Sequence, residues 1–222
     1  MDARRRAGMG KRLVALFTGL LLFGLSIALL VASGLGLDSW DVFHQGLARR
    51  TGLGLGTIVI VVGVVVLALW IPLRERPGFG TVSNAIVVGL ALDAALVVLP
   101  EPETLAPQIL FMVSGIFLNA VATSLYIGAG LGPGPRDGLM TGLARRGFSI
   151  RLVRTGIEVA VLLAGWLLGG TVGIGTVLYA VSIGPLVHYL LPRLSVVEFV
   201  RPEGRAPRPW ASDILAKVRR ND

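Results

Sequence analysis

The sequence has no cysteine and only two histidines among its 222 residues. The absence of cysteine excludes disulfides and thiolate chemistry. The two histidines, His44 and His188, lie far apart without the spacing of metal ligands, so neither a metal site nor a cofactor is expected. The sequence also contains no serine–histidine–acid set and no phosphate-binding loop of motif strength, so we do not expect an enzyme.

Charged residues are also scarce, at 15% of the chain against about 25% in soluble domains. Hydrophobic residues make up 54% of the chain, and several apolar runs reach the roughly 20 residues that cross a bilayer. The sequence therefore predicts an all-α, polytopic membrane protein. The formal net charge is +8, but the basic residues lie between the apolar runs. We therefore expect the lipid bilayer as the partner and no nucleic acid.

Six long apolar segments are expected to cross the membrane as helices. Proline and glycine separate them, as at Pro77-Gly78 and Gly169-Gly170. The predicted spans are residues 13–35, 54–73, 80–99, 107–130, 151–169 and 174–192.

The basic residues predict the orientation of these spans. All but two of the 21 Lys and Arg residues fall on one side of the membrane if the chain crosses six times. That side should be the cytoplasm of a bacterium, with both termini there and the protein in the inner membrane. The segment 1–12 is basic, the linker 100–106 is acidic and external, and the tail 193–222 is basic. Apolar residues at helical spacing in the tail predict an amphipathic helix on anionic lipids.

The chain contains nearly the same unit twice. The first unit, residues 13–99, contains Gly34-Leu35-Gly36, Asp41 and Gly46-Leu47-Ala48-Arg49-Arg50, and the second, residues 107–192, repeats them ninety-six positions later. Each unit has three spans, and an odd number turns the second unit upside down. We therefore expect a 3+3 inverted repeat about a pseudo-two-fold axis in the membrane plane. The first span has the composition of a signal peptide, but its internal counterpart cannot be one, so it should be retained.

A short helix is predicted between the first two spans of each unit, at residues 38–50 and 135–146. Asp38 is a suitable N-cap, and Pro135 suits the first helical position. Two interpretations remain open. Both helices could lie at the membrane interface, where the acid in the first turn and the arginines in the last turn complement the helix dipole. Alternatively, both are re-entrant and bring polar side chains from opposite faces to a shared cavity.

The re-entrant interpretation predicts a solute-binding site from the two repeated motifs. Its candidate residues are Asp41, His44, Arg49, Arg50, Asp137, Arg145 and Arg146. The arginines would bind an anion or pair with the aspartates. Asp93 and Glu158 lie inside predicted spans and are candidates for proton or ion coupling, because charges there are costly and usually functional. The alternatives are an interfacial position for Asp93 and a simple i, i+4 pair of Glu158 with Arg154.

The motif in the first unit is specific enough to suggest a family. Gly34-Leu35-Gly36, Trp40-Asp41-Val42 and His44-Gln45-Gly46-Leu47 are followed by Gly54-x-Gly56-Thr57 and Pro77-Gly78-x-Gly80-Thr81. This pattern resembles the YczE/YyaS/YitT group of bacterial integral membrane proteins and covers the chain to about residue 193. Longer YitT-like members carry an extra soluble domain, whereas about 30 residues follow the last span here, so the chain resembles the short, YczE-like branch. Ser39 stands where the family often has proline, and the resemblance implies no defined activity.

These patterns favour a transporter or permease for an unidentified small solute, with its site between the two repeats. A homodimer is a candidate assembly. The alternative is a non-transporting accessory or scaffold protein of the membrane. A polar cavity at mid-depth that reaches both Asp41 and Asp137 would favour transport, and a solid apolar interior would favour the scaffold.

Overall fold

The computed structural model describes residues 8–147 and 149–197, and within these ranges the secondary structure is helical throughout. The helices are α1 (Met9–Ser33), α2 (Ser39–Thr51), α3 (Leu55–Ala68), α4 (Trp70–Leu73), α5 (Phe79–Val98), α6 (Leu105–Gly128), α7 (Pro135–Ala144), α8 (Ile150–Leu167) and α9 (Ile174–Leu194). The all-α prediction is confirmed for this part of the chain. The amphipathic helix predicted in the tail lies outside the described residues.

Five helical stretches of the described chain are long and apolar enough to cross a membrane: α1, α3 with α4, α5, α6 and α9. The sixth predicted span, 151–169, is helix α8, but α8 is not among these five. Its 18 residues include Arg151, Arg154 and Glu158, which reduce its apolar character. The prediction of six apolar spans is therefore confirmed for five, and α8 is a helix of mixed character.

The start of α1 also differs from the prediction. The helix begins at Met9 rather than at residue 13, so that Lys11 and Arg12 are helical. Arg12 donates through Nε to the Ala129 carbonyl at 2.8 Å and through Nη2 to the Gly130 carbonyl at 2.6 Å. The basic residue thereby stabilises the end of α6, because it supplies a donor to carbonyls that the helix leaves unpaired.

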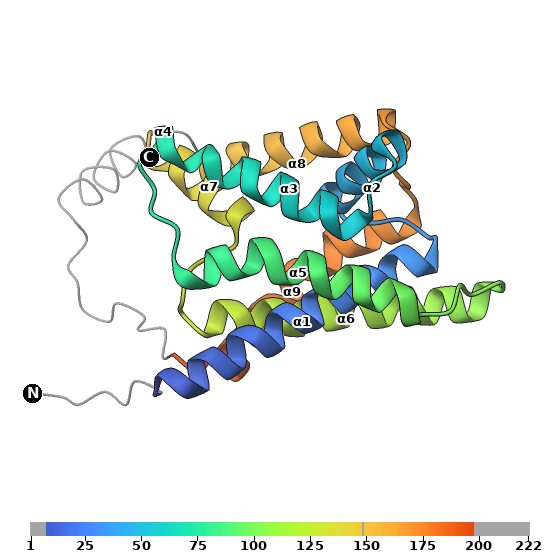
Figure 1. Ribbon diagram of the computed structural model, residues 1–222, viewed down its shortest axis with the longest axis horizontal. Coiled ribbons are helices and arrows are strands. Elements are labelled where there is room, and N and C mark those ends of the chain that lie inside the picture. Colours follow the sequence, from blue (N-terminus) through green and yellow to red (C-terminus); the bar gives the residue numbers. More distant parts are fainter. Residues whose placement is uncertain (1–7, 148, 198–222) are drawn as a thin grey trace, which may run out of the picture.

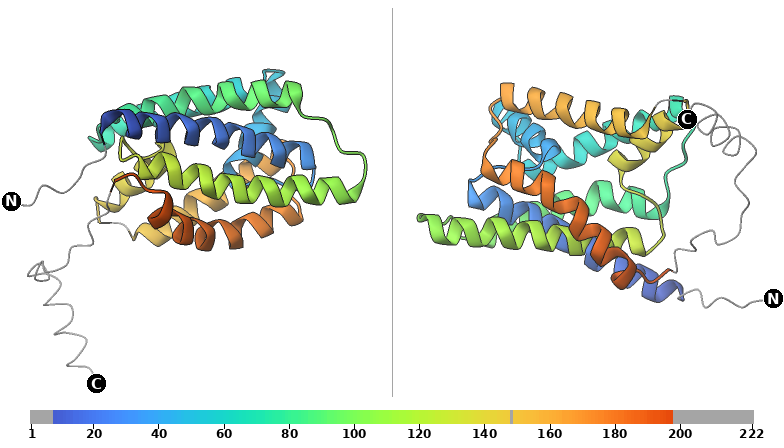
Figure 2. Two further views of the ribbon diagram at one scale, coloured as in Figure 1. Left: turned by 90° about the horizontal axis from the view of Figure 1, so that it is seen from below. Right: turned by 180° about the vertical axis from the view of Figure 1, so that it is seen from behind.

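The helices form two layers. Four of them lie side by side in the order α5, α1, α6, α9, as seen from below in Figure 2. Helices α3 and α8, with the short helices α2 and α7, lie over this layer in Figure 1. The helix α3 packs against α5, and α2 packs against α8.

The first helices of the two units, α1 and α6, cross at glycines. A Cβ added to Gly19 would lie 2.7 Å from the backbone nitrogen of Tyr126, and one added to Gly115 would lie 2.9 Å from Cγ of Leu30. The two glycines occupy the same position in the two units. Small residues allow such close approach of helices, which is how helices commonly associate in lipid.

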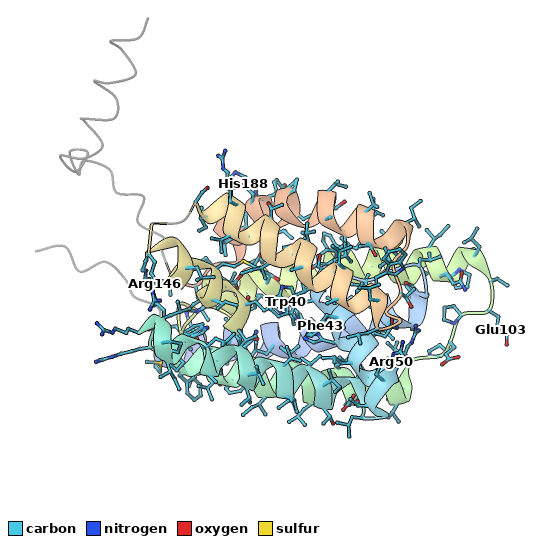
Figure 3. All side chains as sticks on the ribbon, turned by 90° about the horizontal axis from the view of Figure 1, so that it is seen from above. Trp40, Phe43, Arg50, Glu103, Arg146 and His188 are labelled. Carbon is cyan, nitrogen blue, oxygen red and sulfur yellow. The ribbon has the colours of Figure 1, made fainter. Side chains whose placement is uncertain are left out.

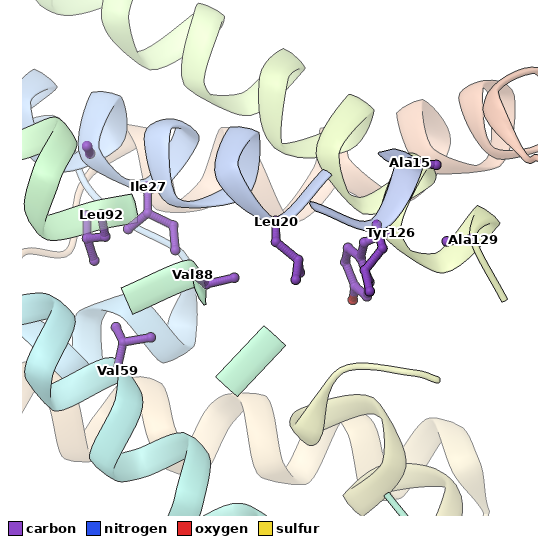
Figure 4. Close-up of a cluster of buried hydrophobic side chains, with 10 residues drawn as sticks. Ala15, Leu20, Ile27, Val59, Val88, Leu92, Tyr126 and Ala129 are labelled. Atoms are coloured by element: carbon purple, nitrogen blue, oxygen red, sulfur yellow. The ribbon is translucent and has the colours of Figure 1, made fainter. Parts of the chain in front are cut away.

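An apolar cluster joins the two layers and is shown in Figure 4. Leu20 and Ile27 of α1 pack with Val88 and Leu92 of α5, and Val59 reaches the cluster from α3. All five side chains are buried. The cluster fixes α3 on the lower layer and so helps to hold the short helices that lie beside α3.

The Gly-Leu-Gly segments exchange contacts between the two units. The Leu35 carbonyl accepts a hydrogen bond from Gly175 at the start of α9, at 2.8 Å, and the Leu131 carbonyl accepts one from Gly80 at the start of α5, at 2.9 Å. Gly36 has φ +117°, a backbone conformation in which an L side chain would be strained. A Cβ at this position would also lie too close to the backbone of Gly173. Each segment thus packs on the third long helix of the other unit, immediately before a short helix begins.

Candidate functional site between the two short helices

The two short helices point their N-termini at each other. Figure 3 shows α2 and α7 between α3 and α8, with Trp40 near the middle of the bundle and Arg50 and Arg146 towards its opposite ends. Trp40 is in the first turn of α2, whereas Arg50 and Arg146 lie at the C-terminal ends of α2 and α7. The residues at the N-terminal ends are therefore brought together, and those at the C-terminal ends are kept apart.

Arg136 in the first turn of α7 links the two N-termini. Its Nη1 lies 3.6 Å from Oδ2 of Asp38, and its Nη2 lies 3.5 Å from Oδ1 of Asp41. His44 Nδ1 lies 3.1 Å from the same Asp41 oxygen. Asp41 and His44 are buried, so this group is a shielded ion cluster in which one guanidinium faces two carboxylates.

Asp38 also has a structural role, because its Oδ1 accepts a hydrogen bond from the Asp41 backbone N–H at 2.6 Å. This is the N-cap that the sequence predicts. The cap residue is thus also one of the two carboxylates that face Arg136.

Trp40 completes the cluster. The Arg136 guanidinium lies over its indole ring, 5.1 Å from the centroid, in a cation–π arrangement. The indole is buried, and its Nε1 is the one buried side-chain nitrogen or oxygen of the described residues with no hydrogen-bond partner. Buried polar groups in folded proteins almost always have a partner, so this donor is available to a bound molecule.

Two sets of side-chain hydrogen bonds involve polar residues of the lower layer. The Tyr126 hydroxyl of α6 donates to Oδ2 of Asp137 at 3.1 Å. The Tyr179 hydroxyl of α9 donates to Oδ1 of Asn119 at 2.9 Å, and Nδ2 of Asn119 donates to Oγ of Ser26 at 2.9 Å. These two hydrogen bonds through Asn119 link α9, α6 and α1.

A cavity of about 620 Å³ lies among these groups. Both short helices line it, through Asp38, Trp40 and His44 of α2 or its cap and through Arg136 and Asp137 of α7. Its further polar lining comes from the long helices and includes Asn84, Asn119, Thr123, Tyr126, Arg154, Glu158, Tyr179 and His188. Asp41 lies directly behind this lining, where it contacts Arg136 and His44. Apolar residues such as Val59 and Ile183 line the remainder.

The structure places the repeated arginines of the first unit outside this cavity. Arg49 donates to the Gly169 carbonyl and to Oγ1 of Thr171, the latter at 3.2 Å, and Arg50 donates to the Leu168 carbonyl at 3.3 Å. These partners lie at and beyond the C-terminal end of α8. Both arginines therefore stabilise a helix end, where carbonyl groups lack intrahelical partners, and they contact neither Asp41 nor Asp137.

The arginines of the second unit behave in the same way at the other end of the bundle. Arg145 forms an ion pair with Glu75 at 2.9 Å, and Arg146 donates to the Pro72 carbonyl. These partners lie in and just after α4. Each pair of arginines thus fixes the end of a short helix to a helix of the other unit. The expectation that these four arginines contribute charge to a solute site stays a prediction, and these contacts lie outside the cavity lining.

The two acids predicted for coupling lie in different surroundings. Oδ1 of Asp93 accepts the backbone N–H of Gly56 at 2.7 Å and so caps the start of α3, away from the cavity lining. Glu158 does line the cavity. The ion pairs of the described chain do not include it, so the expected pair with Arg154 is not formed within 4 Å.

Sequence reasoning missed the central residue of the site, Arg136. It identified Asp38 only as a cap and Trp40 only as part of the family motif. A local signal for Arg136 was present. A cation in the first turn of a helix is unfavourable for the helix dipole, so Arg136 beside Pro135 needed a nearby anion. That the anions come from Asp38 and Asp41 of the other short helix is visible only in the tertiary structure.

Comparison with known proteins now identifies the family. The profile of a family of unknown function, DUF6198, matches residues 10–192. The chain belongs to this family. It is 43% identical to an uncharacterized protein of Haemophilus influenzae over 178 residues, which are 78% of this chain and 82% of that protein.

Two relatives come from Bacillus subtilis. The uncharacterized membrane protein YczE is 32% identical over 180 residues, 80% of this chain and 84% of the relative. The uncharacterized protein YyaS is 27% identical over 181 residues, 78% and 89% of the two chains. The predicted resemblance to YczE and YyaS is confirmed, and so is the membrane character. No solved structure matches the chain.

Proposed function

We propose that this protein is a transporter that moves a small polar solute through the cavity between its two repeat units. The observation that carries this function is the cavity of about 620 Å³ lined by the N-terminal turns of both short helices. In secondary transporters, discontinuous helices whose termini meet near the bilayer centre commonly form the substrate site. A scaffold protein has no need of a buried polar cavity at this place, because desolvating charged groups costs free energy that only a ligand or a function recovers.

The proposal treats the two units as a 3+3 inverted repeat in which α2 and α7 enter the membrane from opposite faces. Matching residues of the two units make matching contacts, as Leu35 does with Gly175 and Leu131 with Gly80. In this arrangement α8, despite its charged residues, is one of the spans that line the site. Its Glu158 then faces the cavity rather than lipid, which is where charges in membrane proteins are tolerated.

The substrate site consists of Asp38, Trp40, His44, Arg136 and Asp137, and Asp41 behind it contacts both Arg136 and His44. Glu158 is the candidate coupling residue, because it lines the cavity without an ion-pair partner among the described residues. Rocking of one unit against the other would open the cavity to each side in turn. Both termini are placed in the cytoplasm of the bacterial cell by the positive-inside rule.

The cysteine-free sequence permits a test that does not require the substrate. Single cysteines replace Thr51 at the C-terminal end of α2, Ser149 before α8 and Thr123 in the cavity lining. An impermeant thiol reagent is applied to right-side-out and inverted vesicles. We expect Thr51→Cys to react only from outside, Ser149→Cys only from the cytoplasmic side, and Thr123→Cys from both sides. Reaction of Thr123→Cys from one side or from neither would exclude alternating access. Reaction of Thr51→Cys and Ser149→Cys from the same side would contradict the proposed inverted orientation of the two units.

A further inference from the structure

The charges around the cavity do not balance. Four carboxylates, those of Asp38, Asp137 and Glu158 in the lining and Asp41 directly behind it, face two guanidinium groups, Arg136 and Arg154. The N-termini of α2 and α7 together add about one positive charge. With neutral imidazoles, an excess of about one negative charge remains. Because Arg154 is exposed at the protein surface, only part of its positive charge acts inside the cavity.

The excess lies on identifiable residues. Arg136 is already shared between Asp38 and Asp41. Asp137 receives only a neutral hydroxyl, from Tyr126, and Glu158 takes part in none of the ion pairs of the described chain. A cation that entered the cavity would therefore find two carboxylates that take part in no ion pair of the described residues.

Aromatic side chains line the same space. Tyr126 and Tyr179 both face the cavity, and aromatic rings attract organic cations through their negative faces. The structure already shows this chemistry in one place, where the Arg136 guanidinium lies over the Trp40 ring. The cavity thus combines acids with aromatic rings, the combination that recognises ammonium groups.

A second, independent observation concerns a neutral part of the ligand. The Trp40 indole is 95% buried, lines the cavity, and carries the unpartnered Nε1 donor. A single N–H donor in an acidic cavity suits an uncharged acceptor, such as a hydroxyl or carbonyl oxygen. It lies beside Arg136 and so at the short-helix end of the cavity.

From these observations we infer that the substrate is a small organic cation whose amine is bound by Asp137 and Glu158 and whose neighbouring oxygen accepts a hydrogen bond from Trp40. An amino alcohol is the simplest molecule of this class. The inference rests on the proposed function for its biological sense, but it makes a claim about binding alone.

The test uses the full-length protein in maltoside detergent and four probes of nearly equal size: ethanolamine, ethylamine, ethylene glycol and glycolate. Thermal unfolding is measured against the concentration of each probe, because a ligand of the folded state raises the melting temperature. Ethanolamine should stabilise most and ethylamine less, while ethylene glycol and glycolate should have no effect. The inference is overturned if glycolate stabilises the protein more than ethanolamine does. It is also overturned if none of the four probes raises the melting temperature.

Variants then assign the residues. Glu158→Gln and Asp137→Asn should each weaken ethanolamine binding at least tenfold, whereas Glu103→Gln in the exposed linker should leave it unchanged. Trp40→Phe keeps a ring beneath Arg136 but removes the donor, so ethanolamine should then bind no more tightly than ethylamine. If Trp40→Phe weakened the binding of ethanolamine and ethylamine equally, the proposed hydrogen bond from the indole would be contradicted. The result is independent of the thiol-labelling test, so a failed cation site and a failed transport function can be told apart.

Discussion

The Arg136 guanidinium lies over the Trp40 indole, 5.1 Å from the ring centroid, and the two residues occupy the same position in the two repeat units, ninety-six residues apart. In a molecule with two-fold pseudosymmetry, matching positions meet only near the axis. The contact therefore marks where the axis of the proposed inverted repeat would pass. At this point the repeat is not identical, since one unit supplies an aromatic ring and the other a cation, and this difference creates the ion cluster with Asp38 and Asp41.

The first prediction concerns Arg136 itself. Arg136→Gln leaves the buried Asp38 and Asp41 carboxylates without their counterion, and breaking a buried pair in this way costs about 3 kcal/mol. Thermal unfolding in detergent should show this loss. Arg145→Gln removes an ion pair whose arginine is 71% exposed and should cost less than about 1 kcal/mol. Equal losses in the two variants would mean that Arg136 is not held in a buried cluster.

The second prediction tests the packing of α2 on α8 with two glycines of the same helix. A Cβ at Gly165 would lie 2.4 Å from the Phe43 backbone nitrogen, so Gly165→Ala must separate the helices and should destabilise by about 1–3 kcal/mol. A Cβ at Gly156 meets nothing within 4 Å. Gly156→Ala should therefore stabilise slightly, by about 0.5–1 kcal/mol, because alanine favours the helix. The difference in melting temperature between the two variants is the measurement, and a destabilised Gly156→Ala would contradict the described packing.

The third prediction concerns the hydrogen-bonded chain through Asn119. Tyr179→Phe removes the donor to Oδ1 of the buried Asn119 and should cost about 1–2 kcal/mol. The matched change on the same helix is Tyr189→Phe, at a ring that is 59% exposed, and it should be nearly neutral. Unfolding in detergent measures both. If Tyr179→Phe and Tyr189→Phe changed the free energy of unfolding equally, the hydrogen bonds through Asn119 would not stabilise the fold.

The fourth prediction separates a structural from a coupling role for Asp93. Asp93→Asn keeps an oxygen that can accept the Gly56 N–H, so stability should change by less than about 1 kcal/mol. Asp93→Leu leaves that N–H unpaired and should cost about 1–3 kcal/mol. Ethanolamine binding and its dependence on pH should be unchanged in Asp93→Asn, whereas Glu158→Gln should alter both. A change in the pH dependence of ethanolamine binding in Asp93→Asn would instead support a coupling role for Asp93.

Asp41 and Arg49 illustrate how far the candidate site could be predicted. The repeated motif, with an acid in the first helical turn, predicts Asp41 as a site residue, and the structure places Asp41 in the cluster with Arg136. The same repetition predicts Arg49 as a site residue, yet it donates to the Gly169 carbonyl and the Thr171 hydroxyl beyond the end of α8. Repetition indicates that a residue occupies the same position in both units, but it does not distinguish a contact with a ligand from one with a helix end.

The sequence by itself determined the helices, the membrane character and the doubled unit, because these depend on local properties: apolar runs of sufficient length, proline and glycine between them, and a motif that recurs at fixed spacing. Only the tertiary structure decided which unit each short helix contacts. The helix α2 packs mainly on α8 of the other unit, and α7 packs on α3 and α4 as well as on α8. Arg136 of the second unit thereby meets Asp38 and Asp41 of the first. Such pairings depend on how whole helices pack, and no local spacing encodes them.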